Sequence, residues 1–69
     1  MVPAKIESNL DKIMYDRGIS YRQLERMSGV SKSMLNAIAN GERLPSLETA
    51  FDIADALNVT INELFFRKK

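Results

Sequence analysis

The feature that most constrains this chain is residues 20–41, where helix start and stop signals alternate. Ser20 and Ser31 are residue types that favour a helix N-cap, and Gln23 completes a capping box with Ser20. Gly29 supplies the positive φ that a sharp helix end needs. The pattern predicts two short helices joined by a tight turn, one over residues 21–27 and one over 32–40.

The second of these helices has two different faces. When successive residues are placed about 100° apart around a helical wheel, Met34, Leu35, Ile38 and Ala39 form an apolar arc. A face exposed only to solvent is more often rich in Glu and Lys. Asn, Ser and Lys instead match the base edges and phosphates of a DNA major groove. The opposite arc therefore favours contact with DNA over plain solvent exposure, and it holds Lys32, Ser33, Asn36, Ala37 and Asn40.

The spacing in this stretch resembles the helix-turn-helix of the phage repressor and Cro family of bacterial regulators, also called the xenobiotic-response-element family. With Tyr21 as the first position, the fourth, ninth, tenth, fifteenth and eighteenth positions are Leu24, Gly29, Val30, Leu35 and Ile38. The similarity continues through NGERLPSLETAFDIADALNVTINELF and covers roughly residues 6–66. It implies an all-α, compact, lambda-repressor-like DNA-binding domain of five helices, with the helix-turn-helix formed by the second and third.

Two residues depart from the pattern of the family. Glu25 stands where Ala usually lies between the two helices, and Ser28 stands where an apolar residue or Thr is usual. A carboxylate buried without a partner would be costly. We therefore expect Glu25 at the edge of the contact, near Lys32 or the positively polarised N-terminus of the second helix.

Length and composition indicate one helix-turn-helix domain spanning residues 1–69, with a flexible arm at 1–4 and a basic tail at 67–69. An apolar share of 45% is ordinary for a globular chain. No apolar run approaches the roughly 20 residues of a membrane span, so we expect a cytoplasmic protein that binds no membrane.

The composition also argues against an enzyme. The chain has no His and no Cys, which removes the commonest catalytic bases and thiol nucleophiles. It also has no glycine-rich phosphate loop and no cluster of metal-ligand residues. We expect no catalytic residue, no metal, no cofactor and no small-molecule ligand.

Charge is segregated along the chain although its net value is only +1. Residues 17–43 contain five basic side chains and two acidic ones. Residues 44–64 contain none that is basic and four that are acidic: Glu48, Asp52, Asp55 and Glu63. The split predicts a positive side around the helix-turn-helix that faces a polyanion.

The remaining helices are predicted from periodicity and caps. Apolar residues at helical spacing predict a first helix over 5–17 that ends at Gly18. Ser46 caps a fourth helix that ends at Asn58, and Thr60 with Glu63 opens a fifth. In the second helix Leu24 and Met27 are expected to point inward. In the fourth helix the expected inward stripe, with Phe51 as its largest member, is Leu47, Ala50, Phe51, Ala54 and Leu57.

The wheel and the family resemblance together nominate residues for contact with DNA. Lys32 could donate to guanine, Asn36 could pair with adenine, and Ala37 could pack on a thymine methyl. The expected base-reading residues are Ser31, Lys32, Ser33, Asn36 and Ala37. The expected phosphate-binding residues are Tyr21, Arg22, Asn40 and Arg43. Tyr21 as a packing residue and Asn40 as a helix C-cap remain open alternatives.

The C-terminal aromatic pair suggests how two copies meet. Phe65 can pack inward, and Phe66 would then point outward beside the basic tail. Family members often pair through this region, which implies a homodimer, with Phe65 and Phe66 at its interface, on a pseudo-palindromic operator in double-stranded DNA. The leading function is a sequence-specific transcriptional regulator, most simply a repressor. The alternative is a protein-interaction module, such as an antitoxin or adaptor, with Phe65 and Phe66 as anchors.

Overall fold

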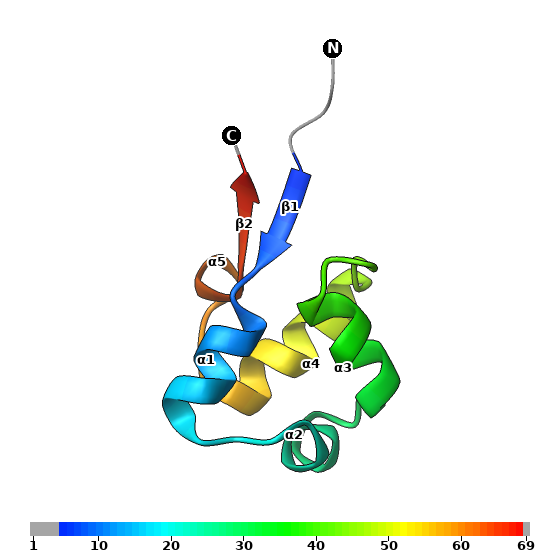
Figure 1. The fold of residues 1–69 in the computed structure, drawn as a ribbon, viewed down its shortest axis with the longest axis vertical. Coiled ribbons are helices and arrows are strands. Elements are labelled where there is room, and N and C mark those ends of the chain that lie inside the picture. The colour runs from blue at the N-terminus through cyan, green and yellow to red at the C-terminus, as the bar shows by residue number, and fades with distance from the viewer. Residues whose placement is uncertain (1–4, 69) are drawn as a thin grey trace.

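In the computed structural model, which describes residues 5–68, five helices surround an apolar core and two short strands pair as a ribbon (Figure 1). The predicted arm at residues 1–4 and the last residue of the predicted tail, Lys69, lie outside the described residues. The elements follow in the order β1 (Lys5–Ser8), α1 (Leu10–Arg17), α2 (Tyr21–Ser28), α3 (Lys32–Ala39), α4 (Leu47–Leu57), α5 (Ile61–Leu64) and β2 (Phe65–Lys68).

The core draws side chains from all five helices, and α2 packs against both α3 and α4. Burial of these apolar side chains is what holds short helices in place, because helices of this length are marginal on their own. The largest fully buried side chains are Leu10, Leu24, Leu35, Ile53, Leu57 and Leu64.

The predicted caps are confirmed, and they set the helix boundaries. In α2 the Gln23 N–H donates to Ser20 Oγ at 3.1 Å while Ser20 N–H donates to Gln23 Oε1 at 2.8 Å. Thr60 and Glu63 form the same reciprocal box at α5. Asn58 ends α4 in the left-handed conformation with φ 58°. Local side-chain chemistry therefore decides where these helices begin and end.

The helix predicted over residues 5–17 is wrong in its first turn. Residues 5–8 form β1, which pairs antiparallel with β2 so that Ile6 lies opposite Arg67 and Ser8 lies opposite Phe65. The Asn9 N–H donates to the Leu64 carbonyl at 2.8 Å, and its side-chain Nδ2 donates to the Glu63 carbonyl at 3.1 Å. Residues 5–8 and 65–68 thus satisfy each other's backbone hydrogen-bonding groups. Because of this pairing, residues 5–8 form a strand although Ile6 has helical spacing with the apolar residues of α1.

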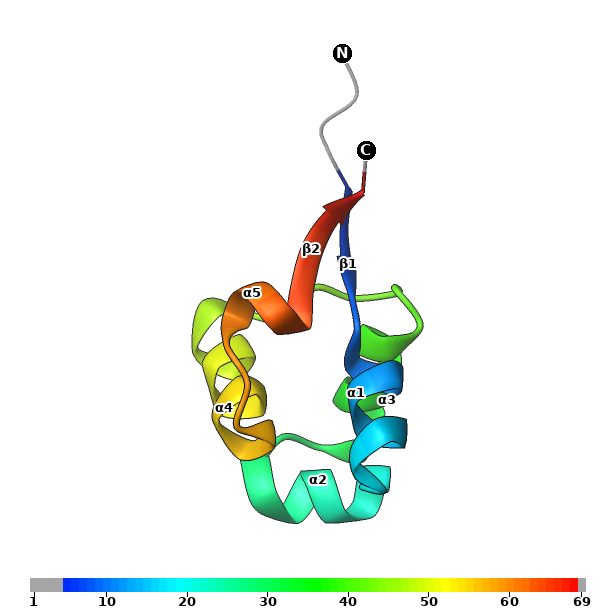
Figure 2. The ribbon, with the colours of Figure 1, turned by 90° about the vertical axis from the view of Figure 1, so that its left-hand side faces the viewer.

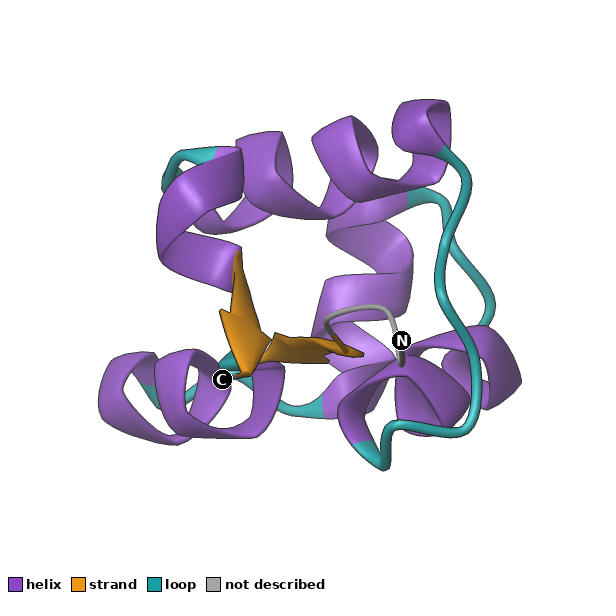
Figure 3. Ribbon diagram, turned by 90° about the horizontal axis from the view of Figure 1, so that it is seen from above, coloured by secondary structure: helices purple, strands orange, loops and turns teal. Residues whose placement is uncertain are grey.

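The ribbon extends from the helices on the side opposite α2. Figures 1 and 2 show β1 and β2 at one end of the molecule and α2 at the other. Seen from above, the helices form a ring around the base of the ribbon (Figure 3). Residues 67 and 68, which composition assigned to a tail, continue strand β2.

The predicted inward stripe of α4 is only partly correct. Ala50, Ala54 and Leu57 are buried, but Leu47 is 70% exposed and Phe51 is 50% exposed. Ile53 takes the place expected for Phe51 and is fully buried. A stripe that contains Phe51 and a stripe that contains Ile53 both have helical spacing. How α4 packs against the other helices therefore decides which of the two side chains is buried. Met27, expected inward on α2, is likewise more than half exposed.

Candidate nucleic-acid interface

The turn between α2 and α3 is closed by Ser28, one of the two residues that depart from the family pattern. Its Oγ donates to the Leu24 carbonyl at 2.7 Å and accepts the Val30 N–H at 3.1 Å. Gly29 adopts φ 76°, a conformation that a residue with a side chain rarely takes. The hydroxyl and the glycine together fix the path of the chain from one helix to the next.

Glu25, the second departure, reaches the N-terminus of α3. The backbone N–H of Lys32 donates to Glu25 Oε2 at 3.0 Å. A carboxylate is favourable here because the unpaired N–H groups and the dipole of a helix N-terminus attract negative charge. The prediction that Glu25 lies at the edge, against this helix end, is confirmed.

The orientation of α3 follows from which of its side chains enter the core. Leu35 and Ile38 are buried, and Met34 and Ala39 are partly buried against the same core. The other side of the helix carries the residues nominated for base reading. On this side of α3 the side chains of Lys32, Ser33 and Asn36 are exposed, and the side chain of Ala37 is partly exposed.

Two polar side chains of this surface already have partners within the helix. The hydroxyl of Ser31 caps α3 by accepting the Met34 N–H at 3.2 Å, and its O–H can still donate. Asn40 Nδ2 donates to Asn36 Oδ1 at 3.4 Å. An amide oxygen accepts two hydrogen bonds, so Asn36 keeps one acceptor site and both Nδ2 donors for another molecule.

Tyr21, at the start of α2, is held against α1. Its side chain packs on the core, and its hydroxyl donates a hydrogen bond to Asp11 Oδ1. Burial, together with the hydrogen bond and the negative charge of Asp11, raises the pKa of Tyr21 to about 12. The sequence gives no signal for this pair, because the two residues belong to different helices whose relative placement depends on the whole fold. Arg22, the next residue, is exposed.

The segment after α3 carries Arg43. Asn40 is the C-cap residue of α3, as its alternative interpretation predicted, and Gly41 follows with φ 77°. The Glu42 N–H donates to the Ala37 carbonyl at 2.9 Å, which ties the segment to the end of α3. The side chain of Arg43 is exposed immediately beyond this anchor.

The aromatic pair of β2 divides as expected. Phe65 is partly buried and packs on the core, whereas Phe66 is 41% exposed. Of these two residues, Phe66 therefore offers the larger aromatic surface to a second molecule.

Residues 5–68 contain no group of three or more His, Cys, Asp or Glu side chains arranged to hold a metal ion. Within the same range, no helix has both the length and the apolar character needed to cross a membrane.

Known proteins share this architecture. A helix-turn-helix family model matches residues 5–64. An uncharacterised HTH-type transcriptional regulator of Sinorhizobium fredii, y4dJ, is 30% identical over 59 residues, which are 86% of this chain and 77% of that protein.

Two crystal structures extend the comparison. The restriction-modification controller protein C.AhdI from Aeromonas hydrophila matches with a TM-score of 0.75 and 27% identity, over 80% of this chain and 83% of that one. A Bacteroides fragilis protein matches with a TM-score of 0.78 over 88% of this chain and 98% of that one. At 20% identity the second likeness concerns the fold alone.

Proposed function

The chain belongs to the Cro/C1-type helix-turn-helix family, and we propose that it is a transcriptional regulator, most simply a repressor, that binds double-stranded DNA with α3 in the major groove. The observation that supports this most strongly is the uncovered polar side of α3, opposite the buried Leu35 and Ile38. A major groove about 12 Å wide admits an α-helix, and small side chains let that helix approach the base edges closely.

The proposed readout uses Ser31, Lys32, Ser33, Asn36 and Ala37. The ammonium group of Lys32 donates to guanine O6 or N7, and the methyl group of Ala37 packs on a thymine methyl. Asn36 pairs with adenine through Nδ2 and the acceptor site of Oδ1 that Asn40 leaves open.

The proposed phosphate grip uses Tyr21, Arg22, Asn40 and Arg43. The exposed guanidinium groups of Arg22 and Arg43 supply charge, and the first turn of α2 offers backbone N–H groups to a phosphate. Tyr21 contributes its backbone N–H, because its hydroxyl hydrogen is already donated to Asp11. We infer that no residue has a catalytic role and that the protein works in the cytoplasm, where its DNA target lies.

The proposed active form is a homodimer on a pseudo-palindromic operator, with Phe66 in the dimer contact. The exposed ring of Phe66 and the short two-stranded ribbon both support this arrangement, because two strands alone are marginally stable in water. Light scattering at high concentration, with and without operator DNA, should detect the dimer. A monomer under both conditions would contradict the proposed homodimer.

The decisive experiment for DNA binding is selection of bound duplexes from a random pool. We expect an enriched site with two half-sites whose centres lie about 10 base pairs apart. The variant Asn36→Ala should enrich a different sequence, whereas Asn62→Ala, which removes an exposed amide on α5, should enrich the original one. Recovery of a pool without any consensus would contradict sequence-specific binding.

A further inference from the structure

The loop before α4 and the outer side of α4 expose three large apolar side chains. Leu44, Leu47 and Phe51 each show half or more of their surface to solvent. Leu47 and Phe51, four residues apart in α4, form one apolar line along the helix. Leu44, in the loop, borders the same hollow as Leu47 and adds to this apolar surface. Exposed apolar side chains that occur singly are normal, but a cluster of three marks an interaction surface.

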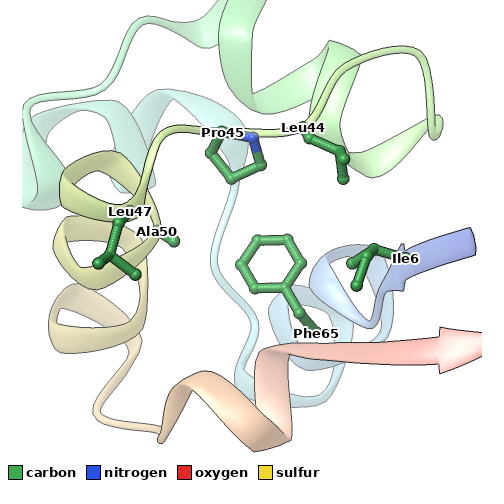
Figure 4. A pocket seen from close by; sticks show the side chains of 6 residues that line it. All are labelled: Ile6, Leu44, Pro45, Leu47, Ala50 and Phe65. Atoms are coloured by element: carbon green, nitrogen blue, oxygen red, sulfur yellow. The ribbon is translucent and has the colours of Figure 1, made fainter.

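A hollow lies at each end of this line. The first, of about 230 Å³, lies between the loop, the start of α4 and the base of the ribbon, and it is lined by Ile6, Leu44, Pro45, Leu47, Ala50 and Phe65. Figure 4 shows the Phe65 ring pointing into the space between these side chains. The second, of about 360 Å³, lies at the other end of α4, and Phe51, Asp55, Val59 and Ile61 are among its lining residues. Apolar surface therefore continues past both ends of the exposed line.

Acidic side chains border the line on one flank. On a helical wheel Asp55, Glu48 and Asp52 follow Phe51 in that order around α4, and all three are exposed. Residues 44–64 contain no Lys or Arg. The surface thus joins an apolar line to a negative border.

We propose that this surface, the α4 face (Leu44, Leu47, Phe51, Glu48, Asp52 and Asp55), binds a segment of another protein, an amphipathic helix whose apolar side chains are flanked by Lys or Arg. Apolar anchors would fill the two hollows, and the basic flank would meet the acidic border. The negative charge repels nucleic acid, so this binding is separate from the proposed contact with DNA.

A second copy of the chain fits the α4 face poorly. A two-fold contact brings the same patch of both copies together. When two antiparallel copies of α4 face each other, the acidic flank of one lies against the acidic flank of the other. Because α4 itself carries no Lys or Arg, that arrangement places like charges together, which costs binding free energy. A basic partner removes the conflict.

The test uses a phage-displayed library of random 16-residue peptides, selected on the full chain. We expect enriched peptides with Leu or Phe at helical spacing and Lys or Arg beside them. One enriched peptide, synthesised and titrated into ¹⁵N-labelled chain, should shift the amide signals of residues 44–62. Leu47→Asp and Phe51→Ser should each weaken it by about tenfold or more, as expected for anchors at the centre of an interface.

Matched variants distinguish binding of the peptide to the α4 face from non-specific hydrophobic binding and from an effect of net charge. Tyr15→Ser removes an aromatic that is 87% exposed on α1 and should leave peptide affinity unchanged. Asp52→Lys should weaken binding, whereas Asp16→Lys on α1, with the same change of net charge, should not. An equal loss for the two charge reversals, no loss for Leu47→Asp, or amide shifts that track only the concentration of the chain itself would each overturn the proposal. Binding of the uncharged variants Phe51→Ser and Tyr15→Ser to DNA, measured in parallel, should stay unchanged.

Discussion

The helix-turn-helix of residues 20–41 and the β1–β2 ribbon are built from contacts of very different range. Each side-chain hydrogen bond between two residues of 20–41 joins positions at most seven apart in the sequence. The widest separation is that between the Lys32 N–H and Glu25. In the ribbon Ser8 pairs with Phe65, and just below it Asn9 reaches Glu63, 54 positions away. Neighbouring residues specify the first unit, whereas the second forms only when the ends of the chain are brought together. The first unit carries all of the proposed DNA contacts except Arg43, and the second carries the proposed dimer contact.

The largest expected effect tests how far stability depends on the core beneath the helix-turn-helix. Leu35→Ala should lower the free energy of unfolding by about 2 to 5 kcal/mol, because it leaves a cavity where the side chain is fully buried. In urea titrations followed by circular dichroism, Leu47→Ala should stay within about 0.5 kcal/mol of the parent. Ile6→Ala in the ribbon should fall between the two. A ribbon variant as damaging as Leu35→Ala would break the comparison.

The next effect concerns DNA binding and distinguishes base readout from phosphate contact. Asn36→Ala should cost about 1 to 3 kcal/mol at one base position of the selected site and relax the preference there. Arg43→Ala should weaken binding to all sequences and flatten the dependence of affinity on salt. Fluorescence anisotropy on matched and mismatched duplexes measures both. Equal losses on every duplex for Asn36→Ala would assign that side chain to the backbone grip instead.

A smaller effect compares one hydrogen bond from each region. Ser20→Ala removes the N-cap of α2 and should lower the free energy of unfolding by about 1 kcal/mol. Ser8→Ala removes the bond from Ser8 Oγ to the Ile38 carbonyl, which is 3.3 Å long, and should cost about 0.5 kcal/mol. Thermal unfolding of both variants decides the order. The reverse order would show that the ribbon base contributes more than the cap.

The smallest effect at neutral pH concerns the contact between α1 and α2. Because the pKa of Tyr21 is raised from 10 to about 12, its contribution to stability is complete below pH 10 and is lost as the pH rises toward 12. In a Tyr15→Phe background, absorbance of the phenolate should report a midpoint near 12 for Tyr21. Adding Asp11→Asn should lower that midpoint, and an unchanged midpoint would show that Asp11 does not act on Tyr21.

The same contrast of range explains what could be predicted from the sequence. Caps such as Ser20, Ser46 and Thr60, and the edge position of Glu25, follow from residues close in the chain, and the structure confirms them. The family prediction is confirmed by the match over residues 5–64. The strand at residues 5–8 could not be predicted, because its hydrogen-bonding partner lies at the other end of the chain.

Two further misses have the same physical cause. Phe51 and Ile53 both fit a helical apolar stripe, and only the docking of α4 on the other helices decides that Ile53 is buried and Phe51 exposed. The hydrogen bond from Tyr21 to Asp11 joins two helices, and no local sequence pattern predicts it. The roles assigned to individual residues in DNA contact stay predictions for the experiments above.

The antiparallel register that sets Lys5 beside Lys68 makes the chain a natural substrate for circular permutation. A two-residue type I′ turn inserted between these positions would convert the pairing of distant strands into a local hairpin. New ends opened in the exposed segment before Ser46 would leave the helix-turn-helix uncut. With the loop-closure entropy of the strands reduced, such a rewired chain should fold faster than its parent.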